Sequence, residues 1–196
     1  MKLRHYQEAA KEAGWHHLRT REDNPCLVIP TGGGKSPLMA AMTSEAVEWG
    51  KRVLLLADRK ELLEQNADKI VKYCPQIDLG VYSAGLGIKN TSNAVIVAGI
   101  QSIWNKAAQI GSVDLAIVDE AHTIQPEGEG RYGSLLKDLK IINPKVRLIG
   151  LTATPYRMKE GLICGPDHLL NHICYEIGVK QLIDEGFLCK LISKRG

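Results

Sequence analysis

A glycine-rich turn near the N-terminus has the residue types and spacing that suit phosphate binding. The chain reads Pro-Thr-Gly-Gly-Gly-Lys-Ser at positions 30–36, directly after a short apolar run. Backbone amides that converge on an anion bind phosphate well, and glycines allow close approach and positive φ. We expect Lys35 to reach the β- and γ-phosphates and the Ser36 hydroxyl to bind Mg²⁺. The residues predicted to bind ATP here are Thr31, Gly32, Gly33, Gly34, Lys35 and Ser36.

The turn departs from the general phosphate-loop pattern at one position. That pattern has a glycine five residues before Gly34, where this chain has Ile29. The alternative interpretation is a flexible glycine turn followed by a surface lysine. A strand before the turn and a helix after it favour phosphate binding, because the N-terminus of a helix attracts anions.

Two carboxylates form the second candidate site. Asp119 and Glu120 follow the apolar run 115–118, and ligands bind beyond the carboxyl ends of strands in open α/β sheets. We expect Asp119 to hold Mg²⁺ and Glu120 to orient or deprotonate the attacking water, since phosphoryl transfer needs positioning and charge neutralisation. Lys35, Asp119 and Glu120 are therefore the candidate catalytic residues. The alternative is a strand followed by a solvated acidic helix cap.

Strands and helices alternate along the chain in a way that would position both motifs. Short apolar runs rich in β-branched residues predict strands buried on both faces, as in a parallel sheet. These strands are expected at residues 26–29, 53–57, 94–98, 115–118 and 146–151. Helices are expected at residues 35–49, 59–73 and 132–142. The alternation predicts an α/β domain with right-handed crossovers.

The helix expected at residues 59–73 has an apolar stripe, which predicts the face that packs on the core. The stripe consists of Leu62, Leu63, Ala67, Ile70 and Val71. Later in the chain, residues 155 to about 171 have an irregular pattern, and no strand–helix unit is expected after them.

The order of the motifs resembles the first RecA-like domain of superfamily 2 helicases and translocases. The similar branch is the DEAD/DEAH-box group that holds type III restriction motor subunits and XPB-like DNA helicases. The sequence Asp-Glu-Ala-His at positions 119–122 carries the box, and the resemblance extends over essentially the whole chain. It implies a RecA-like P-loop NTPase fold, with a mostly parallel central sheet and helices on both faces. Residues 1–196 would form a single helicase ATP-binding domain with ATP and Mg²⁺ as cofactors.

The resemblance also places residues near the N-terminus in the ATP site. Residues 3–7 resemble the family's adenine-reading element. In this element Gln7 would bond the adenine edge, which an amide can do through its donor and its acceptor. Arg4 belongs to the same element and is included among the ATP-binding residues. An exposed glutamine on an N-terminal helix is the alternative.

A third implied role is the coupling of the ATP site to movement. Residues 151–155 match motif III of the family, whose hydroxyls connect the metal-side carboxylates to strand movement. Hydroxyls suit such a relay because they both donate and accept hydrogen bonds. The resemblance therefore implies that Thr152 and Thr154 act with His122 in coupling.

Two further segments resemble nucleic-acid-contacting motifs of the family. Residues 56–62 look like motif Ia, in which Arg59 would contact a phosphate; a solvated arginine at a helix start is the alternative. Residues 97–103 resemble motif Ib, which would direct Gln101 and Ser102 towards the nucleic-acid backbone. The family usually has threonine where this chain has Gly99, which weakens the hydroxyl contact expected there.

Composition sets bounds on partners and location. The net charge is +3 over 196 residues, lower than is usual for a domain that coats DNA, so a nucleic acid would be bound by a few positioned groups. No apolar stretch approaches the roughly 20 residues of a membrane helix. Residues 1–7 lack the apolar core of a secretory signal. We therefore expect a cytoplasmic protein without a membrane partner.

The cysteines favour reduced thiols over a structural metal or a disulfide framework. There are five of them and no CxxC pair, which suits a cytosolic protein. Cys164, His168, His172 and Cys174 raise zinc as an alternative, but their spacing matches no common structural zinc pattern. Residues 179–188 resemble the end of this domain in the branch, which also argues against zinc.

A complete motor of this family has a second RecA-like domain that carries an arginine finger. No such domain follows in this chain before Gly196, and an arginine finger contributes about 10³- to 10⁵-fold in rate in related chemistry. We therefore expect this chain to bind ATP, to hydrolyse it very slowly and to leave duplexes unseparated.

The resulting hypothesis is an ATP-driven motor domain that acts on nucleic acid. DNA is favoured over RNA by the resemblance to the restriction and repair branch. One alternative is an ATP-gated binding switch without processive movement. Another is a P-loop kinase for a small molecule, which the Asp-Glu-Ala-His and Thr-Ala-Thr motifs disfavour. ATPase activity with and without nucleic acid would separate these alternatives.

Overall fold

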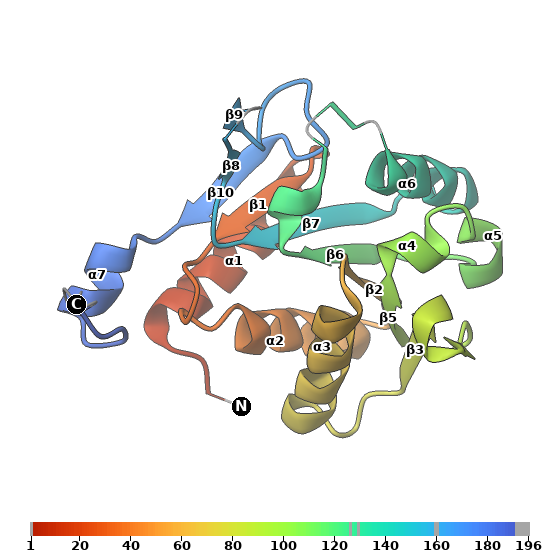
Figure 1. The fold of residues 1–196 in the computed structure, drawn as a ribbon, viewed down its shortest axis with the longest axis horizontal. Helices are drawn as coiled ribbons and strands as arrows, with labels where there is room; N and C mark the ends of the chain where they lie inside the picture. Colours follow the sequence, from red (N-terminus) through yellow and green to blue (C-terminus); the bar gives the residue numbers. More distant parts are fainter. Residues whose placement is uncertain (1, 126, 129, 159–160, 191–196) are drawn as a thin grey trace, which may run out of the picture.

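The computed structural model describes residues 2–125, 127–128, 130–158 and 161–190 (Figure 1). The helices are α1 His5–Thr20, α2 Lys35–Glu48, α3 Lys60–Tyr73, α4 Ile100–Ile103, α5 Ala107–Ile110, α6 Arg131–Ile142 and α7 Val179–Asp184, with 3₁₀ turns η1 at Ala84–Leu86 and η2 at Ala121–Thr123. The strands are β1 Pro25–Val28, β2 Val53–Ala57, β3 Leu79–Ser83, β4 Ile88–Lys89, β5 Val95–Gly99, β6 Leu115–Asp119, β7 Arg147–Thr152, β8 Tyr156–Arg157, β9 Gly161–Leu162 and β10 His172–Glu176.

The central sheet has eight strands in the order β10-β1-β7-β6-β2-β5-β3-β4. Every pair of neighbours is parallel except β3 with β4, and β8 and β9 form a separate antiparallel pair. Because parallel strands end at the same edge of a sheet, the loops after β1, β2, β5, β6 and β7 open on one side of the molecule. The candidate site residues lie at these carboxyl ends of the strands.

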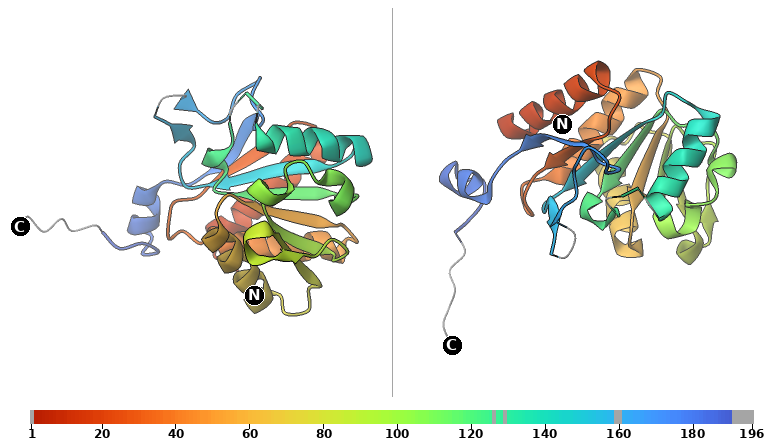
Figure 2. Two further views of the ribbon diagram at one scale, coloured as in Figure 1. Left: turned by 45° about the vertical axis from the view of Figure 1, so that its right-hand side comes forward. Right: turned by 90° about the horizontal axis from the view of Figure 1, so that it is seen from above.

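Helices cover both faces of the sheet (Figure 2). α1, α2 and α3 pack on one face, together with Leu182 of α7. α4, α5 and α6 pack on the other. Successive strand residues alternate between the two cores, so that Leu55 of β2 belongs to the first and Leu54 to the second. A strand that is buried on both faces must be apolar throughout, which explains the continuous apolar runs.

The expected α/β fold is confirmed. All the strands and helices predicted from the sequence are present, and each boundary lies within one residue of the expected position. The expectation that no strand–helix unit follows residue 171 was wrong, because β10 and α7 lie there. β10 pairs with β1 at the edge of the sheet and its side chains are half-buried or exposed. An edge strand therefore lacks the continuous apolar run that predicts a central one.

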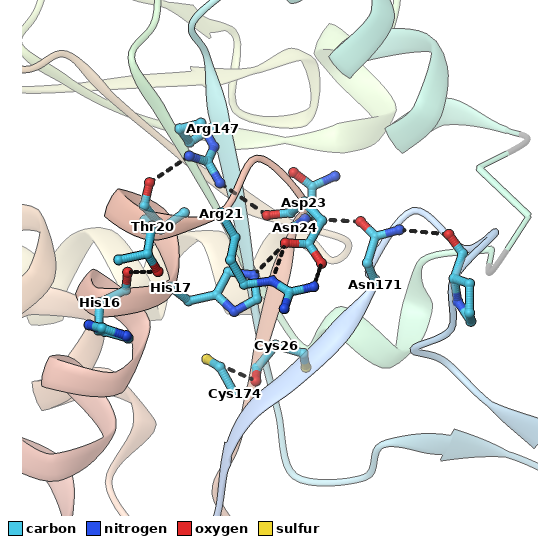
Figure 3. A network of polar contacts seen from close by, with 12 residues as sticks. His16, His17, Thr20, Arg21, Asp23, Asn24, Cys26, Arg147, Asn171 and Cys174 are labelled. Carbon is cyan, nitrogen blue, oxygen red and sulfur yellow. Dashed lines mark hydrogen bonds and ion pairs between the residues drawn. The ribbon is translucent and has the colours of Figure 1, made fainter.

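A polar network connects α1, β1, β7 and the segment before β10 (Figure 3). The Asp23 carboxylate accepts hydrogen bonds from Arg21 at 2.8 Å and contacts His17 Nε2 at 2.9 Å. Arg147 of β7 donates to the carbonyl oxygen of Asp23, and the Asn24 amide donates to Asn171 Oδ1 at 2.9 Å. These contacts attach the edge strand β10 to the turn between α1 and β1.

Asp23→Asn should lower stability in a pH-dependent way. The Arg21 guanidinium that bonds Asp23 holds the pKa of that carboxyl well below its usual 3.8, with help from His17. A carboxylate with a depressed pKa stabilises the fold above its unfolded pKa, and this stability is lost as the pH falls below about 4. We expect the variant to be less stable than the wild type at pH 7, and the difference to shrink towards pH 3, in urea unfolding. The exposed neighbour Glu22, changed to Gln, serves as the control. A pH-independent difference would contradict this role for Asp23.

The described part of the chain lacks two kinds of feature. No helix there is both long and apolar enough to cross a bilayer. The described residues also contain no group of three His, Cys, Asp or Glu side chains that could hold a metal ion. Instead, Cys174 Sγ donates to the carbonyl oxygen of Cys26 at 3.5 Å, and the His172 ring stacks on His17 with centroids 5.5 Å apart.

Candidate active site

The phosphate-loop candidates and the candidate carboxylates lie at the same edge of the sheet. The glycine turn follows β1, and Asp119 is the last residue of β6. β7 lies between these two strands and ends at Thr152. Three neighbouring strands thus bring together residues that are more than 80 positions apart in sequence.

The glycine turn has a backbone conformation that favours glycine. Gly32 and Gly34 have φ values of 79° and 84°, in the left-handed region that favours glycine. A Cβ at Gly33 would lie 2.7 Å from Ile29 Cγ2, and the Tyr6 hydroxyl donates to the Gly33 carbonyl oxygen at 2.7 Å. α2 begins directly after Gly34, and the first amides of a helix have no intrahelical acceptor. The turn therefore fits a phosphate group.

Lys35 and Glu120 meet across the site. Lys35 Nζ lies 3.4 Å from Glu120 Oε1, and the other carboxylate oxygen lies 3.3 Å from His122 Nδ1. Glu120 has a φ of 50° and is the only described non-glycine residue with a positive φ. Such strain persists where the surrounding structure enforces it, and it is common at active sites. The strained backbone places the Glu120 side chain between a lysine and a histidine.

Asp119 and Ser36, the candidate Mg²⁺ ligands, both contact α3. Asp119 is 7% exposed. Its Oδ1 accepts from the Glu120 amide at 3.0 Å, and its Oδ2 accepts from Asn66 Nδ2 at 2.8 Å. Lys69 Nζ donates to Ser36 Oγ at 2.9 Å. A carboxylate and a hydroxyl supply the oxygen ligands that Mg²⁺ prefers, so the residues present fit this ion.

The candidate coupling residues are joined at the end of β7. Thr152 is fully buried, and its hydroxyl lies 3.1 Å from His122 Nδ1. The same hydroxyl bonds the backbone of Thr154, both its carbonyl oxygen and its amide. Thr154 thus joins the group through its backbone, and its own side chain is on an exposed residue. Coupling by these residues stays a prediction.

Gln7 contacts the phosphate loop directly. Its side chain is on a residue only 4% exposed, and Nε2 donates to the carbonyl oxygens of Gly33 and Gly34 at 3.2 and 3.1 Å. Oε1 accepts from the Arg4 amide at 2.9 Å. The alternative of an exposed glutamine was therefore wrong, whereas adenine recognition by Gln7 and Arg4 stays a prediction.

Residues of the C-terminal segment pack around the glycine turn. Sequence reasoning missed these contacts. The Phe187 ring packs edge-on against Tyr6 with centroids 5.1 Å apart, and the Arg4 guanidinium lies 4.8 Å above the same ring. Leu182 and Leu188 lie beside Gly33 and Gly32. The only signal in the sequence was the likeness of residues 179–188 to the end of the family domain.

The candidate nucleic-acid residues lie at the ends of the neighbouring strands β2 and β5. Arg59 and Gln101 are exposed, and Gln101 donates to Asp58 at 3.1 Å. Ser102 Oγ accepts from the Ala84 amide at 3.0 Å. A cavity of about 440 Å³ is lined by Arg59 on one side and by Glu120 and His122 on the other. The structure thus brings the candidate nucleic-acid contact next to the candidate catalytic carboxylate.

Asn66 and Lys69 are the other contacts that sequence reasoning missed. The expected apolar stripe of α3 was wrong at one position, because Val71 is 52% exposed and Asn66 is 2% exposed. Asn66 follows Leu63 by three positions and precedes Ile70 by four, so it lies on the core face of the helix. A polar residue at a core position was the available signal.

Comparison with known proteins identifies relatives among helicases. Residues 1–157 match the family described as type III restriction enzyme, res subunit. The chain is 25% identical over 179 residues to ATP-dependent DNA helicase MPH1 of Candida albicans, a match that covers 83% of this chain and 14% of that protein. It is 30% identical over 129 residues to a 51.5 kDa protein of a Lactococcus phage, covering 66% of this chain and 24% of the relative. The chain thus spans less than a quarter of the length of these relatives.

Solved structures share the fold. The helicase domain of Pyrococcus furiosus Hef matches with a TM-score of 0.66 and 26% identity, over 89% of this chain and 38% of that one. The type ISP restriction–modification enzyme LlaGI, solved with a DNA substrate mimic, matches with a TM-score of 0.71 and 17% identity, over 95% of this chain and 21% of that one. With the phosphate loop and the Asp-Glu-Ala-His strand at one edge of a parallel sheet, these matches show that the chain belongs to the type III restriction enzyme res subunit family, as a RecA-like helicase ATP-binding domain of superfamily 2.

Proposed function

We propose that this chain binds ATP with Mg²⁺ and supplies the first half of the active site of a nucleic-acid-dependent motor. The backbone of Thr31, Gly32, Gly33 and Gly34 would hold the phosphates, and Lys35 would neutralise the β- and γ-phosphates. Arg4 and Gln7 would recognise the adenine. The contact between Lys35 and Glu120 at 3.4 Å supports this proposal most directly, because it brings the phosphate-binding cation to the carboxylate that would direct the water.

The metal ion would be held by Ser36 and Asp119. When bound, Mg²⁺ neutralises charge that develops on the phosphates. Glu120 would orient the attacking water and take its proton. His122, Thr152 and Thr154 would couple changes at the phosphate site to movement of β7. The hydrogen bond at 3.1 Å between His122, next to the site, and Thr152, at the end of β7, supports this role.

The proposed partner is a nucleic acid, with DNA favoured over RNA. The relatives MPH1 and Hef are named as helicases, MPH1 as a DNA helicase, and LlaGI was solved with a DNA substrate mimic. Arg59, Gln101 and Ser102 would contact the backbone of one strand, which carries little sequence information. The free thiols are compatible with the cytoplasmic location that we propose.

A second RecA-like domain of the same protein is the other proposed partner. In this arrangement, residues 1–196 form one domain, and the second domain would close the site and contribute an arginine finger. Since such a finger is worth about 10³- to 10⁵-fold in rate in related chemistry, the domain alone would turn over ATP very slowly.

The proposal is tested by measuring ATP affinity and hydrolysis of this chain with and without single- and double-stranded DNA and RNA. We expect Mg²⁺-dependent binding of ATP, slow hydrolysis and no strand separation. Absence of ATP binding would contradict the proposed site. Brisk hydrolysis stimulated by nucleic acid would contradict the need for a second domain, and phosphate transfer to a small molecule would indicate a kinase.

A further inference from the structure

α3 places a buried amide against the candidate metal-binding carboxylate. Asn66 is 2% exposed, and its Nδ2 donates to Asp119 Oδ2 at 2.8 Å across 53 residues of sequence. A buried polar side chain is costly without a partner, and here the partner is the carboxylate itself. Since the Glu120 amide bonds the other oxygen at 3.0 Å, the two donors together fix the orientation of the Asp119 carboxylate.

One turn farther along the same helix, a lysine contacts the candidate metal-binding hydroxyl. Lys69 is half-buried, and its Nζ donates to Ser36 Oγ at 2.9 Å. Residues three positions apart lie on the same face of a helix. One face of α3 therefore reaches both of the residues that would hold Mg²⁺, and it does so with groups of different charge.

We propose that α3 controls the metal-binding side of the site through two residues with opposite effects. Asn66 is a positioning residue that holds the Asp119 carboxylate ready for a divalent cation. Lys69 weakens cation binding for two reasons. Its ammonium group donates a hydrogen bond to Ser36 Oγ, the oxygen that would bind the metal, and its positive charge repels a cation. This inference rests on the proposed function, in which Ser36 and Asp119 bind Mg²⁺.

The expected magnitudes follow from the nature of each contact. Hydrogen-bond partners behind a metal ligand usually contribute about 10- to 100-fold to metal affinity, so loss of the Asn66 amide should weaken Mg²⁺-dependent binding by about 10-fold or more. The Lys69 ammonium and a divalent cation near the same hydroxyl repel each other. Removing that charge should strengthen Mg²⁺-dependent binding about three- to tenfold at low ionic strength.

The position of α3 relates the metal-binding side of the site to the candidate nucleic-acid contact. The helix begins at Lys60, immediately after Arg59, the candidate nucleic-acid contact. Arg59, Asn66 and Lys69 thus belong to one short segment, of which residues 60–73 are a continuous helix. A nucleic acid bound at Arg59 would therefore act on the metal side through a single rigid element.

The experiment measures the affinity of the complete chain for a fluorescent ADP analogue, once with Mg²⁺ and once with EDTA. The ratio of the two affinities isolates the contribution of the metal. We expect this ratio to fall for Asn66→Ala and to rise for Lys69→Met. Asp68→Ala and Lys72→Met are the matched controls, because both change exposed residues of the same helix, and both should keep the wild-type ratio.

The outcomes separate this inference from the proposed function. If the wild type binds the analogue in an Mg²⁺-dependent way but Asn66→Ala and Lys69→Met match their controls, the control by α3 is overturned while the ATP site stands. If the wild type does not bind the analogue, the proposed function fails and the inference fails with it. Thermal unfolding checks the fold of Asn66→Ala, and should that variant not fold, an unchanged ratio for Lys69→Met alone overturns the inference.

Discussion

Lys35→Ala should abolish most nucleotide binding by this chain, with an affinity for Mg²⁺–ATP about 10- to 100-fold weaker than that of the wild type. The ammonium group would make charge-assisted hydrogen bonds to the phosphates, and each such bond contributes about 1.5–3 kcal/mol. The substitution also leaves Glu120 without the cation that lies 3.4 Å from it. An unpaired carboxylate beside a triphosphate adds repulsion, so the two effects act in the same direction.

Titration calorimetry with a slowly hydrolysed ATP analogue measures this effect directly. Lys145→Ala is a suitable control, because Lys145 is exposed and lies just before β7, at the end of the strand far from the site. The control should bind as the wild type does. If Lys35→Ala retained wild-type affinity while remaining folded by circular dichroism, the glycine turn would not be the phosphate site.

Glu120→Gln should retain nucleotide binding and remove hydrolysis. A positioned general base contributes about 10²- to 10⁴-fold, and an amide cannot take the proton from water. Glutamine keeps the shape of the side chain and faces the same backbone strain at φ 50°, so the fold should change little. We also expect slightly tighter ATP binding, because one negative charge near the phosphates is lost.

Single-turnover hydrolysis of radiolabelled ATP, with the chain in excess, is sensitive enough for a slow basal rate. The wild type and Glu12→Gln, a change at an exposed glutamate of α1, should release phosphate at equal rates. Equal release by Glu120→Gln would show that another group directs the water. A loss of ATP affinity together with hydrolysis would instead indicate that Glu120 mainly holds Lys35 in place.

The strained Glu120 also contacts one of the candidate coupling residues. Its carboxylate lies between Lys35 and His122, and His122 in turn contacts the buried Thr152 hydroxyl at the end of β7. A change in the Lys35–Glu120 contact on ATP binding would therefore alter the His122 contact as well. Because β7 lies between β1 and β6, this series of contacts runs along the carboxyl ends of three neighbouring strands.

Local sequence patterns were sufficient for β1, β2, β5, β6 and β7 and for the main motifs, but not for β3, whose burial alternates. A strand buried on both faces must be apolar at every position, so the runs at β2 and β6 were visible directly. The glycine turn and Asp119-Glu120 were recognisable because phosphate binding demands particular residue types at fixed spacing. The parallel sheet then requires these motifs to meet at one edge, which made the juxtaposition of Lys35 and Glu120 predictable.

The tertiary structure decided what these motifs contact. The edge strand β10 and the packing of Phe187 on Tyr6 have no local signature, because they depend on surfaces that form only when distant segments meet. The contacts of Asn66 and Lys69 likewise depend on distant segments, because their partners are 53 and 33 residues away; the polar residue at a core position of α3 signalled only that Asn66 needs a partner. Periodicity reports which face of a helix is buried but not what it is buried against. The sequence by itself therefore determined the chemistry of the candidate phosphate site, and the tertiary structure decided that α3 contacts its candidate metal ligands.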